Sequence, residues 1–252
     1  MTQAVAIIAG EDRQRSEALA QHLSLPLFDA ITALPAECIA YLRYFDNKLQ
    51  LFPAGAQSGP IAVNFAGNAT AHRLRSGGEL IVKAVRGRSK EALHIVDATA
   101  GLGRDSFILA ANGFRITAFE REPVISALLA DGLQRALVAD DTTIREIAQH
   151  ISLHAADACE HLATAINDVD VVYLDPMFPH SDKNALVKKD MRLFQQLFMT
   201  RDDEAEKLLT NARTAARLRV VVKRPAKAPP LAEVEPAYTI TGKAVRFDVY
   251  PC

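Results

Sequence analysis

Cysteine, long apolar runs and an excess of charge of one sign are all scarce in this chain of 252 residues. Its three cysteines, Cys38, Cys159 and Cys252, are widely separated, and no cluster of histidine and cysteine has metal-ligand spacing. A disulfide framework and a zinc or other metal site are therefore not expected. The formal net charge of −1 supplies no overall positive field for binding nucleic acid, so any RNA contact must use local basic patches.

Membrane-spanning and secretory features are also missing from the sequence. The longest apolar stretches, such as 171–174 and 220–222, have the length of a strand and fall far short of the roughly 20 residues that cross a bilayer. The first residues lack the basic region and the apolar core of a signal peptide. We therefore expect a cytoplasmic protein without membrane contacts. The 49% of hydrophobic residues suffices for a substantial core.

Strand-like and helix-like segments alternate from about residue 92 onward, which is typical of βαβ units with a parallel sheet. Strands are expected at 94–98, 115–120, 152–157, 169–175 and 217–223. Helices are expected at 104–112, 123–138, 142–150, 158–167, 185–199 and 203–216. Prolines then interrupt the alternation, and 238–241 and 244–250 flank a Gly-Lys turn as a hairpin. A parallel sheet closed by an antiparallel pair predicts a Rossmann-like domain of the methyltransferase type over residues 91–252.

Residues 1–90 are less regular and are expected to form a small α/β appendage packed on the main domain. Short strands are predicted at 5–9, 49–52 and 61–65, and a helix is predicted near 12–22. The expected fold class of the whole chain is therefore α/β, with an N-terminal α/β appendage followed by the Rossmann-like domain.

The segment 95–105, IVDATAGLGRD, has the pattern of a strand, a glycine turn and a helix start. Glycines let the backbone turn sharply and approach a ligand, and the free amides of the helix favour polar or anionic groups. A cofactor site with Asp97, Gly101 and Gly103 is expected here. The pattern alone is weak, because many tight turns need glycine for steric reasons. Ser106 replaces the third glycine of the dinucleotide fingerprint, which lowers the case for NAD or FAD.

Two carboxylates follow at the ends of the next two expected strands. Glu120 could accept both hydrogens of a ribose diol, as acidic residues do in adenosine-containing cofactor sites. It could instead begin a solvated turn. Asp157 could reach the adenine amino group, or it could cap the helix that starts near Cys159.

The tetrapeptide Asp175-Pro176-Met177-Phe178 ends the apolar run 169–174. It resembles the [D/N]-P-P-[F/Y] loop of methyltransferases that modify exocyclic amines of nucleobases, with Met177 in place of the second proline. In that loop the carboxylate accepts hydrogen bonds from the amine and the aromatic ring stacks on the base. Asp175, Pro176 and Phe178 are therefore the expected catalytic residues. Alternatively, Asp175 caps a turn, Pro176 ends the strand and Phe178 returns to the core.

Basic residues occur on both sides of this loop and could contact phosphates around the pocket. Each of them could also lie on an ordinary solvated face. Arg224 stands out, because it precedes a proline at the carboxyl end of an expected strand. The expected RNA-binding residues are His72, Arg73, Lys188, Lys189, Arg192, Lys223 and Arg224.

Several longer stretches together resemble the ribosomal RNA small subunit methyltransferase J family. They are VDATAGLGRD (96–105), FEREP (119–123), VVYLDPMFPH (171–180), ALVKKDMR (185–192) and VVVKRP (220–225), with a further likeness over 65–73. The resemblance implies a class I methyltransferase that uses S-adenosylmethionine. It also implies methylation of the N2 amine of one guanine, position 1516, in the 16S rRNA of the small ribosomal subunit.

The resemblance places the cofactor contacts on four short stretches of this sequence. They are Arg104-Asp105, Glu120-Arg121, Ala156-Asp157 and Asp175. Relatives carry two small hydroxyl residues at the third of these, so contacts from Ala156 and Asp157 are expected to come from the backbone. No metal and no obligate protein partner are implied.

Three other functions remain open from the residues alone. The amine could belong to adenine in DNA, because the four-residue loop does not name its base. The chain could be a non-catalytic RNA-binding assembly factor that retains the fold. A hydride-transferring dehydrogenase is the third possibility, and Ser106 and the amine-orienting loop disfavour it.

Overall fold

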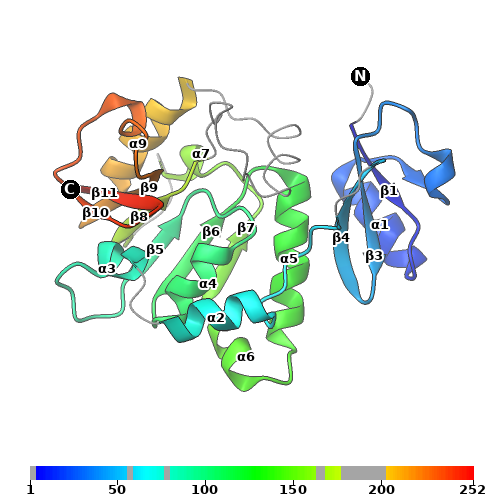
Figure 1. Cartoon of the computed structure of the whole chain (residues 1–252), viewed down its shortest axis with the longest axis horizontal. Coiled ribbons are helices and arrows are strands. Elements are labelled where there is room, and N and C mark those ends of the chain that lie inside the picture. Colours follow the sequence, from blue (N-terminus) through cyan, green and yellow to red (C-terminus); the bar gives the residue numbers. More distant parts are fainter. Residues whose placement is uncertain (1–3, 56–58, 77–79, 163–167, 177–202) are drawn as a thin grey trace.

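The structure is a computed structural model, and it describes residues 4–55, 59–76, 80–162, 168–176 and 203–252. These residues form two sheets (Figure 1). A four-stranded sheet has the order β2-β1-β3-β4, and a seven-stranded sheet has the order β10-β11-β9-β8-β5-β6-β7. In the described ranges, no helix combines the length and apolar character needed to cross a bilayer.

The seven-stranded sheet confirms the predicted architecture. Its parallel strands are β5 (His94–Asp97), β6 (Arg115–Phe119), β7 (Ile151–His154), β8 (Val171–Leu174) and β9 (Arg219–Pro225). The antiparallel strands β10 (Tyr238–Thr241) and β11 (Val245–Pro251) close one edge. The chain runs outward from β5 to β7 and returns to β8 on the other side of β5. This reversal of strand order marks the place where open α/β sheets bind ligands, at the carboxyl ends of the strands.

Helices cover both faces of this sheet, which explains why β8 is buried along its whole length. Successive residues of β8 point to opposite faces. Val171 and Tyr173 belong to the core with helices α3, α4 and α5, whereas Val172 and Leu174 belong to the core with α7 and α9. The helices are α3 (Leu80–Arg86), α4 (Arg104–Ala111), α5 (Pro123–Leu137), α6 (Thr142–Gln149), α7 (Ala158–Leu162) and α9 (Asp203–Ala215). The remainder of the predicted helix 158–167 and the predicted helix 185–199 lie outside the described residues.

The N-terminal sheet lies beside α5 (Figure 1). It contains β1 (Val5–Ile8), β2 (Leu27–Phe28), β3 (Ala40–Phe45) and β4 (Lys48–Pro53), with helix α1 (Arg13–Leu23). Asp131 of α5 ties the two parts together, because its carboxylate accepts the backbone N–H of Leu49 at 3.1 Å. Arg15 of α1 and Arg135 of α5 also donate to it, at 3.2 and 2.8 Å. A buried carboxylate is thus satisfied by three donors.

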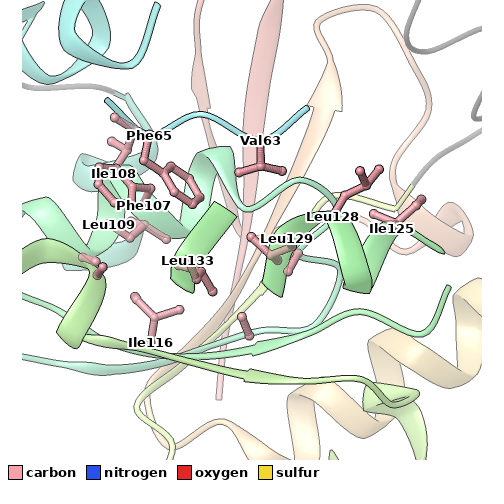
Figure 2. Packing of buried hydrophobic residues seen from close by; sticks show 14 of the residues in the cluster. Val63, Phe65, Phe107, Ile108, Leu109, Ile116, Ile125, Leu128, Leu129 and Leu133 are labelled. Atoms are coloured by element: carbon pink, nitrogen blue, oxygen red, sulfur yellow. The ribbon is translucent and has the colours of Figure 1, made fainter. Parts of the chain in front are cut away.

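The linking segment after the first sheet is not the strand predicted at 61–65. It contributes only an isolated bridge between Ile61 and Leu51. Its side chains instead pack on the main domain, where the ring of Phe65 stacks on Phe107 with centroids 4.2 Å apart (Figure 2). Val63 lies directly over Gly132 of α5, where a Cβ would collide with it. The segment is therefore held by packing, and it has no continuous strand partner.

Two helices follow this segment that the sequence patterns did not predict, α2 (Asn68–Ser76) and α3. They contact α4, and α3 also contacts β9, β10 and β11. These contacts attach residues 68–86 to the seven-stranded sheet. The division of the chain at residue 90 stays a prediction, and the contacts favour a boundary nearer residue 60.

Candidate active site

The glycine turn between β5 and α4 forms one wall of the site. Gly101 and Gly103 have φ angles of +55° and +70°, in the left-handed region that disfavours other residues. A Cβ at Gly101 would meet no described atom within 4 Å, so the described part of the chain leaves room for a ligand beside this residue. At Gly103 a Cβ would collide with the side chain of Leu129. Gly101 thus faces the site, and Gly103 packs against the core.

Glu120 lies directly after β6, opposite the glycine turn. Its Oε2 accepts the N–H of Gly101 at 2.8 Å, and its Oε1 accepts the N–H of Glu122 at 2.8 Å. Burial raises the pKa of Glu120, and these two backbone bonds oppose the rise. A carboxylate offers about four acceptor positions, so Glu120 can still accept the hydrogens of a diol. This geometry argues against the solvated turn considered from the sequence, because Glu120 is only 8% exposed.

Asp97 lies beneath the turn, with 1% of its surface exposed. Its carboxylate accepts the hydroxyl of Ser106 and the N–H of Thr99, the latter at 3.2 Å. Burial raises the pKa of Asp97 to about 7. This position speaks against a direct contact between the Asp97 side chain and a cofactor. It also gives Ser106 a role of its own as the hydroxyl partner of a buried carboxyl group.

Asp105, in the first turn of α4, is the centre of an ion network. Its Oδ2 accepts the hydroxyl of Tyr173 at 2.7 Å and the ammonium of Lys223 at 2.8 Å. Its Oδ1 accepts the guanidinium of Arg73, from α2, at 2.9 Å. Burial opposes ionisation of Asp105, but the charges of Lys223 and Arg73 and the hydrogen bonds outweigh it and hold the pKa at about 2. The carboxylate is therefore charged at neutral pH.

Asp175 follows β8 and lies on the same network. Its Oδ2 accepts Lys223 Nζ at 2.7 Å, and its backbone N–H donates to Thr99 Oγ1 at 2.6 Å. The second bond joins the loop that follows β8 to the glycine-turn segment. The Asp175 side chain is 39% exposed. Partial burial raises its pKa, and Lys223 opposes that rise.

The remaining predicted site residues are distributed around this centre. Arg121 Nη1 lies 3.6 Å from Asp157 Oδ2, and Asp157 Oδ1 accepts the N–H of Cys159 at 2.8 Å, as expected for a helix cap. Ala156 and Pro176 are half-buried, and Arg104 is exposed. Phe178, Lys188, Lys189 and Arg192 lie outside the described residues.

The predicted phosphate contacts within the described residues have different surroundings. Arg224 is 4% exposed, and its Nε donates to the carbonyl of Pro229 at 2.9 Å, so its burial speaks against the predicted RNA contact. Lys223 is engaged by two carboxylates. Arg73 is bound to Asp105, whereas His72 is exposed.

The sequence patterns missed three polar groups of the site, on Thr99, Ser106 and Tyr173. In the sequence, Tyr173 lies within the apolar run 169–174, which gives no sign of a role for its hydroxyl. Residues two apart on a strand share a face, so its position two residues before Asp175 was an available signal. The same rule applies to Lys223. Val221, two residues before it on β9, pairs with Tyr173 of β8, so Lys223 lies on the face of Tyr173.

The fold and the site together define a class I S-adenosylmethionine-dependent methyltransferase. The family described as "Putative SAM-dependent methyltransferase" matches residues 28–252. A solved SAM-dependent methyltransferase from Neisseria gonorrhoeae superposes with a TM-score of 0.75 and 36% identity, covering 98% of this chain and 95% of that chain.

Similar curated proteins identify the family within this class of methyltransferases. A protein from Thioalkalivibrio sulfidiphilus is 45% identical over 251 residues, covering 96% of this chain and 95% of its own length. A protein from Haemophilus ducreyi is 49% identical over 210 residues, covering 81% and 82%. Both are named ribosomal RNA small subunit methyltransferase J. This chain belongs to the ribosomal RNA small subunit methyltransferase J family.

S-adenosylmethionine is the cofactor of this enzyme, and the residues of the site fit it. The open space beside Gly101 can admit a ligand against the backbone. Glu120 has acceptor positions left of the kind that a ribose diol requires. The first amides of α4 favour polar or anionic groups of the ligand.

Proposed function

We propose that this protein methylates the N2 amine of one guanine, position 1516, in the 16S rRNA of the small ribosomal subunit, in the cytoplasm. The observation that carries this proposal is the place of Asp175, at the carboxyl end of β8 and bonded through Thr99 to the cofactor turn. The names of the relatives support ribosomal RNA of the small subunit as the substrate. The choice of guanine N2 rests on the family resemblance of the sequence motifs.

In this proposal, one group of residues holds the cofactor. Gly101 offers its open face, Glu120 accepts the ribose hydroxyls, and the backbone near Asp157 meets the adenine. S-adenosylmethionine, when bound, supplies a methyl group attached to a positively charged sulfur. The protein must then bring an amine nitrogen into line with that methyl group.

Asp175 orients the amine. An exocyclic amine is a poor nucleophile, because its lone pair is delocalised into the ring. The Oδ2 atom of Asp175 is bonded to Lys223, whereas no donor within the described part of the chain meets Oδ1. Oδ1 can therefore accept an N–H of the amine and take up the proton that the amine loses. Because partial burial raises the pKa of Asp175, it is a better proton acceptor than an ordinary carboxylate.

Placement supplies much of the expected acceleration. Well-aligned groups reach effective molarities on the order of 10⁵ M or more, so a strong base is not required. A base in paired RNA must first leave its stack, at a cost of a few kcal/mol. We assign Phe178 to the stacking that offsets this cost. Phosphate contacts are assigned to exposed His72 and, among residues outside the described part, to Lys188, Lys189 and Arg192.

The test is transfer of labelled methyl groups to small subunits or 16S rRNA that lack the modification. Nucleosides from the product are separated and identified by mass. The proposal expects the label on guanine N2 and nowhere else. Label only on adenine would favour an adenine methyltransferase, and RNA binding without affinity for S-adenosylhomocysteine in calorimetry would favour an assembly factor. Either result would reject the proposal.

A further inference from the structure

Lys223 occupies an unusual position between two carboxylates that belong to different walls of the site. Its Nζ lies 2.7 Å from Asp175 Oδ2, on the loop expected to orient the base. The same atom lies 2.8 Å from Asp105 Oδ2, on the helix that follows the glycine turn. One ammonium group thus links the carboxylate of the base side with that of the cofactor side.

The register of β9 directs Lys223 into this position. Val221 pairs with Tyr173 of β8, and Lys223 lies two residues further along the same face. Arg224 points to the other face, where it is buried and bonded to Pro229. The two adjacent cations therefore have separate environments, and only Lys223 lies on the face of Tyr173 and Asp105.

The carboxylates of Asp105 and Asp175 hold the ammonium group of Lys223 in place. Arg73 and Lys223 balance Asp105 and Asp175, so the network of four side chains has no net charge. Burial lowers the pKa of Lys223, but the two carboxylates outweigh it and raise the pKa above its usual value. Lys223 is therefore a permanent donor at neutral pH. Contact with a phosphate would require it to leave two charged partners, which costs more than turning a solvated lysine.

We propose that Lys223 is a positioning residue for methyl transfer: it holds Asp175 by Oδ2, so that Oδ1 faces the target amine, and anchors this carboxylate to Asp105. The inference rests on the proposed function. It replaces the phosphate contact expected from the sequence with a role inside the site.

The role predicts a specific pH effect. The charged or titratable groups around Asp175 in the described part of the chain are the cations Lys223 and Arg224 and the groups Asp97, Asp105 and Tyr173. Among these groups, Lys223 forms an ion pair with Asp175. Without it the carboxylates repel each other with less compensation, so the pKa of Asp175 rises. In a plot of kcat against pH, the rise of kcat on the acidic side (the acid limb) should then move to higher pH.

The experiment compares Lys223→Met and Lys223→Gln with the wild-type enzyme in the labelled-methyl assay. Both changes should lower kcat about 10²-fold, the order of loss expected from a 1 Å misplacement of a reacting group. KM for the RNA should change less than about threefold, and the acid limb should move to higher pH. Lys223→Arg, which keeps the charge, should leave the acid limb at its wild-type position and restore part of kcat.

Exposed Lys227 provides the matched control, because Lys227→Met also removes one positive charge from the loop after β9. It should leave kcat and the pH profile unchanged. The inference is overturned if either neutral Lys223 variant keeps kcat and the acid limb while KM rises and the salt dependence of binding falls by about one charge, the result for a phosphate contact. Thermal unfolding shows which variants are folded. If Lys223→Met does not fold, the test relies on Lys223→Gln. Absence of guanine labelling by the wild type would instead reject the proposed function.

Discussion

The backbone N–H of Gly101 donates to Oε2 of Glu120 at 2.8 Å, which joins two turns that follow neighbouring parallel strands. Oε1 of the same carboxylate accepts the backbone N–H of Glu122 at 2.8 Å. Glu120 therefore shapes the glycine turn while it offers acceptor positions to a ligand. This double role makes it the residue on which cofactor affinity should depend most.

The first prediction concerns Glu120→Gln. The amide removes the negative charge and one of the two acceptor oxygens, so both the diol contact and the turn are weakened. A hydrogen bond to a charged group contributes about 1.5–3 kcal/mol, which corresponds to a rise in Kd of about 10- to 100-fold. Calorimetry with S-adenosylhomocysteine measures this change. Glu122→Gln is the control, with an expected change below about threefold, and equal affinities for all three proteins would contradict the role of Glu120.

Asp175→Ala separates catalysis from cofactor binding. The variant removes the acceptor that orients the amine and takes up its proton, so kcat should fall about 10²- to 10⁴-fold, the range of general base effects. Affinity for S-adenosylhomocysteine should stay within about threefold of the wild type, because the backbone bond from residue 175 to Thr99 is kept. Single-turnover transfer and calorimetry on the same preparation check both statements. Unchanged turnover would show that Asp175 has another role.

Asp97→Asn tests the buried carboxyl group through pH. Burial raises its pKa in the folded protein from 3.8 to about 7. The protonated form of Asp97 contributes to the free energy of unfolding. This contribution is complete below about pH 4 and is lost as the pH rises through 7. Because one pKa unit equals about 1.4 kcal/mol, the loss amounts to up to about 4 kcal/mol.

The amide that replaces the Asp97 carboxyl group in this variant stays neutral, so the free energy of unfolding should fall less between pH 4.5 and 8 than in the wild type. Urea denaturation at both pH values gives the comparison. Asp105 acts in the opposite sense, because its pKa of about 2 makes its contribution present above pH 4 and lost as the pH falls toward 2. Above pH 4.5 Asp105 stays ionised in both proteins, and the other buried carboxylates are common to both, so the difference between the two pH dependences reports Asp97. Equal pH dependence in the two proteins would mean that Asp97 ionises normally.

Asp131→Ala tests the connection between the N-terminal sheet and α5. The change leaves the amide of Leu49 and the guanidinium of Arg135 without their buried acceptor. Removing one partner of a buried charge network costs about 3–5 kcal/mol. Urea denaturation should show this loss, whereas Asp140→Ala at an exposed site should change the free energy of unfolding by no more than about 0.5 kcal/mol. Equal stabilities of the two variants would mean that the network does not hold the parts together.

The seven-stranded sheet was predictable because each of its strands lies in a repeating strand and helix unit or in the closing hairpin. Boundaries differed by a few residues, as for β8, which is shorter than the predicted 169–175. The N-terminal part was less predictable. Its strand β3 (Ala40–Phe45) and the helices α2 and α3 are short, and packing against other segments stabilises them. The supposed strand at 61–65 is apolar because it packs on α4 and α5, and it makes only one bridge.

The sequence by itself predicted which strand-end carboxylates lie beside the glycine turn. Parallel strands end at one edge of their sheet, so Glu120 and Asp175 had to meet the glycine turn once the strands were recognised. Only the tertiary structure decided their partners. Lys223 and Arg224 are neighbours in sequence, yet one binds Asp105 and Asp175 while the other is buried against Pro229. Strand register and helix packing bring residues 73, 105, 175 and 223 together, and these long-range contacts depend on the whole fold and leave no local pattern in the chain.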